Sequence, residues 1–172
     1  MEISNKKLMI RSASVNDVDT LCEWWSDGQI MAHAGFPDGI KTDKENLRLK
    51  LENQDDNLHS MMIVYDDISI GEMSYRIKND IAEIGIKICN FEYQDRGLGK
   101  IYLKMLINYL FSELCVEKIV LDTNLKNKRA QYVYETLGFK KVNINIDAWK
   151  DQRGFNQSSV DYELNKVDWS SE

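Results

Sequence analysis

The sequence predicts an α/β fold of the α+β kind, in which helices pack on one mixed sheet. Short apolar runs and two-residue alternation predict strands, whereas a 3.6-residue apolar period predicts helices. These segments follow the order β-α-α-β-β-β-α-β-α-β-β, which gives about seven strands and about four helices. Hydrophobic residues make up 43% of the chain, enough for a substantial core. With one proline and no repeat or linker, residues 1–172 are expected to form a single domain.

The N-terminal part is expected to form a strand followed by two helices. The strand covers residues 7–13, KLMIRSA. Ser14 is expected to cap the first helix, because Asp17 stands three residues later in the position of a capping-box acid. Glycines and the single proline predict a loop at residues 27–40 with a short helical turn, and a second helix is expected over residues 43–53.

Strands dominate the rest of the chain. They are expected at residues 58–66, 68–78, 81–88, 117–123, 139–148 and 158–165. A strongly periodic helix begins near Leu98, and a second covers residues 127–137. Gly138 lies just past the end of the second helix, where glycine is favoured because it adopts a left-handed conformation readily.

Composition excludes several classes of function. The net charge is −6 and no long basic run occurs, which argues against nucleic acid as a partner. Three widely spaced cysteines and two distant histidines predict neither a disulfide framework nor a metal site. No apolar run reaches the roughly 20 residues that span a bilayer, so no membrane association and a cytoplasmic location are expected. The acidity weakly favours a cationic partner, although many cytoplasmic proteins are simply acidic.

Two glycines stand at the start of the helix near Leu98. Gly97 and Gly99 are costly there, because a helical glycine is about 1 kcal/mol less favourable than alanine. The N-terminus of a helix carries free N–H groups and a partial positive charge, and glycine lets an anion such as a phosphate come close. Tight packing is the alternative explanation. Neither a dinucleotide fingerprint nor a P-loop is present.

The surrounding residues resemble a known family. Gln94-Asp95-Arg96-Gly97-Leu98-Gly99 is similar to the Q/R-x-x-G-x-G/A signature of the GNAT superfamily of acetyl-CoA-dependent N-acetyltransferases. Residues 127–139, NKRAQYVYETLGF, resemble that family's second motif. The branch that it most resembles holds ribosomal-protein and aminoglycoside 6′-N-acetyltransferases. The resemblance implies a mostly antiparallel, twisted sheet that splays between its fourth and fifth strands, at residues 81–88 and 117–123.

The resemblance also implies a site for acetyl-CoA. Its pantetheine arm is expected to pair with the backbone of strand 81–88, and its pyrophosphate is expected on the N–H groups at the start of the helix. A backbone N–H near Ile86 or Lys87 is expected to face the developing oxyanion. The residues implied in binding are Ile86, Lys87, Ile88, Gln94, Asp95, Arg96, Gly97, Leu98, Gly99, Lys100 and Asn127.

Transfer of an acetyl group to an amine needs a proton donor and a proton acceptor. Tyr134 matches the family tyrosine that donates a proton to the departing thiolate, although a packing tyrosine would give the same pattern. Glu83 stands where some members of the family carry a general base; an exposed acid, or a partner of Lys87, is the alternative. Glu72 is the next candidate for the base, and a water relay is left open.

The acceptor site is expected between residues 20–45 and the last two strands. Aromatic and acidic side chains suit an ammonium group through cation–π contacts and charge. The residues proposed to bind the acceptor are Trp24, Trp25, Asp27, Phe36 and Trp149. The alternative is that one tryptophan packs in the core and the acids are solvated.

The sequence therefore predicts an N-acetyltransferase that moves the acetyl group of acetyl-CoA to a primary amine. The acceptor is a small cationic molecule or a peptide or protein N-terminus, and the amine attacks directly in a ternary complex. The alternative is a sensor or assembly module with this fold that binds acyl-CoA without efficient turnover. A homodimer is left open, and no metal is expected.

Overall fold

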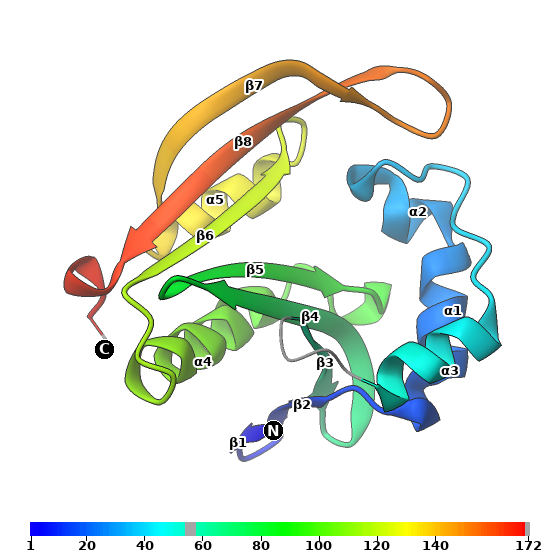
Figure 1. Cartoon of the computed structure of the whole chain (residues 1–172), viewed down its shortest axis with the longest axis horizontal. Helices are drawn as coiled ribbons and strands as arrows, with labels where there is room; N and C mark the ends of the chain where they lie inside the picture. Colours follow the sequence, from blue (N-terminus) through cyan, green and yellow to red (C-terminus); the bar gives the residue numbers. More distant parts are fainter. Residues whose placement is uncertain (54–57, 171–172) are drawn as a thin grey trace.

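The computed structural model describes residues 1–53 and 58–170, and in these ranges eight strands form one sheet (Figure 1). Their order across the sheet is β1-β2-β3-β4-β5-β6-β8-β7. Neighbouring strands are antiparallel except β5 and β6, which are parallel. The strands are β1 (Glu2–Asn5), β2 (Leu8–Ser12), β3 (His59–Tyr65), β4 (Ile68–Lys78), β5 (Ile81–Ile88), β6 (Lys118–Asn124), β7 (Lys140–Lys150) and β8 (Asn156–Asn165). The predicted mixed, mostly antiparallel sheet is confirmed.

One strand was missed by the sequence analysis. Strand β1 pairs with β2 across a tight hairpin, in which Lys6 has a left-handed backbone with φ of 57°. Its residues are largely polar, because β1 is the edge strand of the sheet and most of its side chains face solvent. The apolar periodicity that predicts strands is therefore weak there.

Five α-helices lie in the described ranges. They are α1 (Val18–Ser26), α2 (Gly28–Met31), α3 (Lys44–Glu52), α4 (Leu98–Ser112) and α5 (Lys128–Thr136). Helix α2 is the short turn expected in the loop at residues 27–40. The capping box of Ser14 and Asp17 is present, but it starts a 3-10 turn that leads into α1. Gly138 follows α5 with a φ of 92°, as its position predicted.

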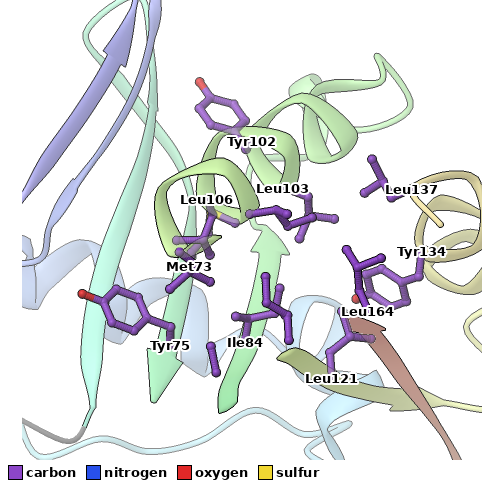
Figure 2. Close-up of a cluster of buried hydrophobic side chains, with 14 of the residues drawn as sticks. Met73, Tyr75, Ile84, Tyr102, Leu103, Leu106, Leu121, Tyr134, Leu137 and Leu164 are labelled. Atoms are coloured by element: carbon purple, nitrogen blue, oxygen red, sulfur yellow. The ribbon is translucent and has the colours of Figure 1, made fainter. Parts of the chain in front are cut away.

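Two apolar clusters lie on opposite faces of the sheet. The larger one packs α4 and α5 against the sheet, with Leu103 and Leu106 from α4 and Ile84 from β5 (Figure 2). The smaller one packs α1 and α3 against the other face, where Leu21 and Leu47 meet Met62. Successive side chains of a strand point to opposite faces of the sheet. A strand covered on both faces therefore contributes side chains to both clusters, and a strand covered on one face contributes to one cluster and exposes its other side chains to solvent.

The sheet opens between β5 and β6. Their parallel pairing covers only Ile81–Glu83 and Lys118–Val120, and beyond these residues the two strands separate. Figure 1 shows β6, β8 and β7 diverging together from β5. The predicted splay between the fourth and fifth expected strands is therefore confirmed, and it places unpaired backbone of β5 beside an open space.

Candidate active site

A cavity of about 770 Å³ occupies the opening between β5 and β6. We call it the main cavity. Its wall is formed by the second half of β5, the start of α4, the second half of β6, and parts of α2, α5 and β7. The sequence-predicted residues on this wall are Ile86, Lys87, Ile88, Gln94, Asp95, Gly97, Gly99, Lys100, Asn127, Tyr134 and Trp149.

Helix α4 begins at the main cavity without a side-chain cap. Its N-cap, Gly97, has a left-handed backbone with φ of 72° and makes no side-chain hydrogen bond. By contrast, Asp43 caps α3 and Asn127 caps α5 through their side-chain oxygens. The first N–H groups of α4, the longest helix of the described chain, thus face the cavity. An anion there can accept hydrogen bonds from them.

The described chain gives no packing reason for Gly99. A Cβ on Gly99 would meet only the Cγ1 atom of Ile88, at 3.9 Å, which is an ordinary contact. A Cβ on Gly97 would meet nothing within 4 Å, although the positive φ of this residue favours glycine. Space is therefore open on the outer side of both residues. The alternative of glycines required by tight internal packing does not fit this geometry, whereas close approach of a phosphate does.

The backbone of β5 and a side chain of α5 position the loop before α4. Gln94 donates from Nε2 to the carbonyl oxygen of Ile88 at 2.8 Å. Arg129 on α5 donates to Gln94 Oε1 at 3.2 Å and to Asp95 Oδ1 at 3.0 Å. Asp95 itself has a φ of 57°. These bonds connect the loop to both sides of the main cavity.

Three residues implied in acetyl-CoA binding have other surroundings. Leu98 is buried in the larger apolar cluster, and the Arg96 guanidinium lies 5.4 Å from the centre of the Tyr93 ring. Neither lines the main cavity. Asn127 lines it, but its Oδ1 atom accepts the N–H of Ala130 as the cap of α5, at 3.2 Å.

Tyr134 reaches from α5 into the main cavity. Its ring packs against Phe139 and, edge on, against Tyr162, and only 7% of the residue is exposed. Figure 2 shows it beside Leu121 of β6 and Leu164 of β8. Burial, and secondarily the charge of Asp122, raises the pKa of Tyr134 to about 12. Within the described chain no hydrogen bond holds its hydroxyl group, which is therefore a protonated donor available to a ligand.

The two predicted carboxylates are placed differently. Glu83 is exposed on β5, paired across the sheet with Arg76, and lines neither this cavity nor the second one described below. Glu72 lies inside the fold, where it accepts from Trp25 Nε1 at 3.0 Å and pairs with Lys87 Nζ at 3.1 Å. Glu83 thus lies outside both cavities, whereas Glu72 lines the second cavity and is already engaged by Trp25 and Lys87.

Asp122 was missed by the sequence analysis. It lies on β6 just beyond the last residue paired with β5, and it lines the main cavity. Asp122 is exposed by its accessible surface. Partial loss of hydration beside the surrounding protein, followed by the charges of Asp161 and Glu83, nevertheless raises the pKa of Asp122. Its signal in the sequence is an acid within the apolar strand KIVLDT, the same signal that singled out Glu83.

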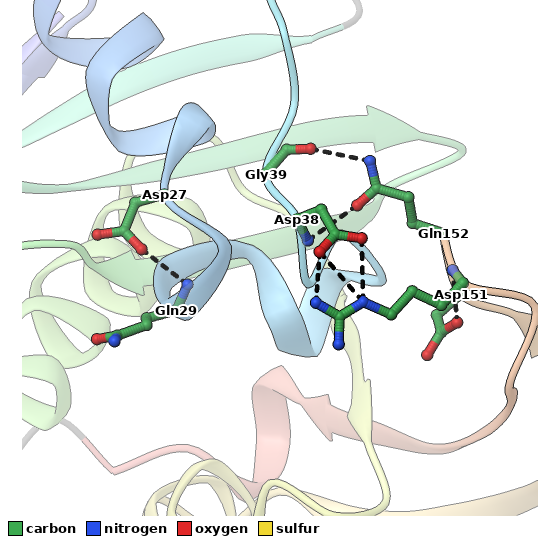
Figure 3. Close-up of polar contacts among 7 residues, drawn as sticks. Asp27, Gln29, Asp38, Gly39, Asp151 and Gln152 are labelled. Atoms are coloured by element: carbon green, nitrogen blue, oxygen red, sulfur yellow. Dashed lines mark hydrogen bonds and ion pairs between the residues drawn. The ribbon is translucent and has the colours of Figure 1, made fainter.

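The residues predicted for the acceptor do not form one cluster. Trp149 lines the main cavity, and its indole ring packs against Gly35. The contact is so close that a Cβ atom added to Gly35 would overlap the ring. Trp24 is buried in the smaller apolar cluster, as the alternative reading of one tryptophan required. Asp27 caps α2 by accepting the N–H of Gln29 at 2.7 Å (Figure 3). Phe36 is exposed and lines neither cavity.

The loop after α2 is bound to the turn between β7 and β8 (Figure 3). Gln152 accepts the N–H of Asp38 and donates to the carbonyl oxygen of Gly39, both at 3.0 Å. Its own N–H donates to the carbonyl oxygen of Gly35 at 2.8 Å. These bonds join two segments more than 100 residues apart, and their neighbours Ala34 and Trp149 line the main cavity.

A second cavity of about 370 Å³ lies between helices α1 and α3 and the sheet. Trp25, Leu47 and Leu51 belong to its helical side. Its sheet side includes Glu72 and a floor formed by Ser60, Ser74 and Gly85. The floor is one row across three neighbouring strands, because Ser60 pairs with Ser74 and Ser74 pairs with Gly85. The second cavity shares Gly85, Ile86 and Lys87 with the main cavity, so the two approach each other along β5.

Known proteins share this architecture. A family model described as the Acetyltransferase (GNAT) domain matches residues 7–140. A protein of Bacillus subtilis (strain 168), the uncharacterized N-acetyltransferase YnaD, is 24% identical over 162 residues, which cover 88% of this chain and 94% of that protein.

Two solved structures share the fold. The ribosomal L7/L12 alpha-N-protein acetyltransferase RimL, in complex with coenzyme A, has a TM-score of 0.84 at 17% identity over 96% of this chain and 98% of its own. A spermidine N-acetyltransferase from Vibrio cholerae, in complex with CoA and spermine, has a TM-score of 0.83 at 21% identity over 95% and 98% of the two chains.

The fold and the family match define an acetyl-CoA-dependent N-acetyltransferase. The chain belongs to the GNAT acetyltransferase family, as the two sequence motifs predicted. In the described ranges no helix is long and apolar enough to cross a membrane, and no group of three or more His, Cys, Asp or Glu side chains is arranged to hold a metal ion.

Proposed function

We propose that this protein transfers the acetyl group of acetyl-CoA to the primary amine of a small cationic molecule or of a peptide N-terminus. The amine attacks the thioester directly while both substrates are bound. The observation that carries the proposal is that two cavities approach each other at Gly85, Ile86 and Lys87 of β5. One cavity leads from the uncapped start of α4, and the other lies against the opposite face of the sheet.

The donor fits the main cavity along its length. The pyrophosphate would lie on the N–H groups of Gly97 to Lys100, where the helix carries a partial positive charge. The amides of the pantetheine arm would pair with the backbone of Ile86 and Ile88, which β6 leaves unpaired. Lys100 adds a positive charge to the same wall. The thioester would then lie near the shared segment of β5.

Tyr134 supplies the proton that a departing thiolate needs. The Tyr134 side chain is buried in the wall of the main cavity, and its hydroxyl group has no partner in the described chain. The hydroxyl group is protonated at neutral pH because its pKa is raised to about 12. A protonated phenol in this position can donate a hydrogen bond to the sulfur, and a proton to it, as negative charge develops there during C–S bond cleavage. The packing of the ring against Phe139 and Tyr162 fixes where the hydroxyl group points.

The charges around the cavities favour a cationic acceptor. Asp122 lies on the wall of the main cavity, with Asp161 and Glu83 close enough to raise its pKa. Trp149 adds an aromatic face to the same cavity, which suits an ammonium group. The structural neighbours include enzymes named for spermidine and for a ribosomal protein N-terminus, and both acceptors carry an ammonium group at neutral pH.

The experiment is a thiol-release assay with acetyl-CoA and a panel of amines. The panel contains polyamines, amino acids, aminoglycosides and peptides with free N-termini, and N-acetylated peptides serve as the control. We expect release of free coenzyme A only with some of the unblocked amines, with the acetylated product visible by mass spectrometry. Calorimetric binding of acetyl-CoA without release for every amine would favour the sensor instead.

A further inference from the structure

We propose that the second cavity binds an apolar group of the acceptor, so that the substrates of this enzyme are amines that carry one ammonium and one aliphatic or aromatic group. The inference rests on the proposed function and narrows its substrate class. The ammonium would lie at residues 85–87 of β5, which both cavities share. The apolar group would extend from there into the space between α1, α3 and the sheet.

The helical side of the second cavity is apolar. Leu21 and Trp25 of α1 line it, together with Leu47 and Leu51 of α3. Leu58, just before β3, also lines it and is 40% exposed, so its side chain meets water unless a ligand covers it. Such walls favour an apolar ligand group, because binding removes the apolar surface of both partners from water.

The sheet side of the second cavity is open because its side chains are short. On β3, Met62 is fully buried in the smaller apolar cluster, whereas Ser60, the next residue on the same face, fills little space. Ser74 lies opposite Ser60 on β4, and Gly85 lies opposite Ser74 on β5. The packing of helices on the sheet thus stops at this row. The volume left, about 370 Å³, is that of a small ligand pocket.

Backbone geometry does not require the glycine in this row. Gly85 is not among the glycines with a positive φ. A Cβ on it would come within 3.1 Å of the Oγ atom of Ser74, which is close but involves only the end of a small side chain. Unfilled volume beside a core costs stability. The row leaves such a volume where the second cavity approaches the main cavity, and a ligand group there would fill it.

The charged side chains of the second cavity neutralise each other. Among the described residues on its wall, only Glu72 and Lys87 are charged, and they pair at 3.1 Å. Trp25 Nε1 also donates to both carboxylate oxygens of Glu72, at 3.0 Å and 3.1 Å. A second ammonium on the ligand would have to displace Lys87 or lie against leucine side chains, where an unpaired charge is costly. The second cavity therefore disfavours diamines and polyamines.

The first test compares matched amines with the full-length wild-type protein in the thiol-release assay. One pair is heptylamine and 1,6-diaminohexane, in which a second ammonium replaces the terminal methyl group. The other pair is leucine amide and lysine amide. We expect kcat/KM to be about tenfold or more higher for the apolar member of each pair. From butylamine upward it should rise about fourfold for each added CH2 until the second cavity is full.

The second test locates the apolar group in the second cavity. Ser74→Val adds a methyl group to the floor and should lower kcat/KM for heptylamine about tenfold. Acetyl-CoA affinity, measured by calorimetry, should not change, because its expected contacts lie on β5 and α4. Leu51→Ala enlarges the cavity from the helical side and should shift the preferred alkylamine to a longer chain. The controls are Ser69→Val on the same strand and Leu49→Ala on the same helix; both residues line neither cavity and should leave amine preference unchanged.

Three results would overturn the proposal. The first is a dicationic member of either pair that equals or exceeds its apolar partner, and the second is turnover of polycations alone. The third is a pair of folded variants, Ser74→Val and Leu51→Ala with cooperative thermal unfolding, that keep the wild-type amine preference. A wild-type protein that binds acetyl-CoA and releases no thiol with any amine would instead contradict the proposed function itself.

Discussion

Arg153, in the turn between β7 and β8, binds the carboxylate of Asp38 in the loop after α2, with Nε 3.1 Å and 3.0 Å from the two oxygens. The two residues are 115 positions apart in the chain. The same loop and turn are joined by Gln152 and by the contact between Trp149 and Gly35. We call this set of contacts the loop–hairpin contact. It holds in place Trp149 and the segment that follows Ala34, and both of these residues line the main cavity.

The loop–hairpin contact predicts a selective effect on the acceptor. Gln152→Ala removes two hydrogen bonds to the backbone of the loop, worth together about 1.4 kcal/mol or more, and should raise KM for the amine about tenfold. Acetyl-CoA affinity should not change, because its expected contacts lie on β5 and α4. Steady-state kinetics with both substrates measures the effect.

The control is Lys140→Ala, which removes an exposed ion pair with Asp168 at the other end of β7. Equal weakening of donor and acceptor would contradict a role confined to the acceptor side.

Gly99→Ala should change stability and binding in opposite directions. Alanine is favoured over glycine in a helix by about 1 kcal/mol, and the added Cβ meets only Ile88 at an ordinary distance. The melting temperature should therefore rise slightly, while acetyl-CoA affinity falls about tenfold because the Cβ lies where a phosphate approaches. Thermal unfolding and calorimetry measure the two effects.

The control is Gly138→Ala. Gly138 lies away from the cavity and has a φ of 92°, so this change should lower stability and leave acetyl-CoA affinity unchanged. A more stable Gly99→Ala that binds acetyl-CoA as the wild type does would place the pyrophosphate elsewhere.

Tyr134→Phe should lower turnover without weakening the fold. The ring keeps its contacts with Phe139 and Tyr162, and the hydroxyl group that is lost has no partner in the described chain. We expect kcat to fall about 100-fold and acetyl-CoA affinity to stay within twofold. Because its pKa is raised to about 12, Tyr134 is protonated throughout the neutral range, so its titration should leave no limb in the kcat profile below pH 10. Unchanged turnover in the variant would remove Tyr134 from the proposed mechanism.

The sequence predicted the fold well because its signals are local. The periods of 2 and 3.6 residues identify seven of the eight strands, and the capping box at Ser14 and the glycine after α5 mark element ends. Edge strand β1 was missed because most of its side chains face solvent and carry little periodicity. The splay between β5 and β6 came from the resemblance, since no local pattern specifies where two strands part.

The candidate site was predicted unevenly. Gly97 and Gly99 are separated by one residue and their cost is visible in the sequence, so the uncapped start of α4 was located correctly on the chain. The carboxylates were not, because Glu83, Glu72 and Asp122 all appear as acids in apolar strands. Which of them lines the main cavity, which lines neither cavity and which is bound by Trp25 and Lys87 depends on the neighbouring strands.

By itself, the sequence determined the family, the order of the elements and the helix start where backbone N–H groups are left for an anion. Those properties depend on residues close together in the chain, whose spacing fixes periodicity, capping and backbone freedom. Only the tertiary structure decided that Asp122 shares a cavity with Tyr134, that Trp24 packs in the core, and that the loop at Asp38 is bound to the turn at Arg153. These relationships depend on strand pairing and on contacts between distant segments, which no local spacing specifies.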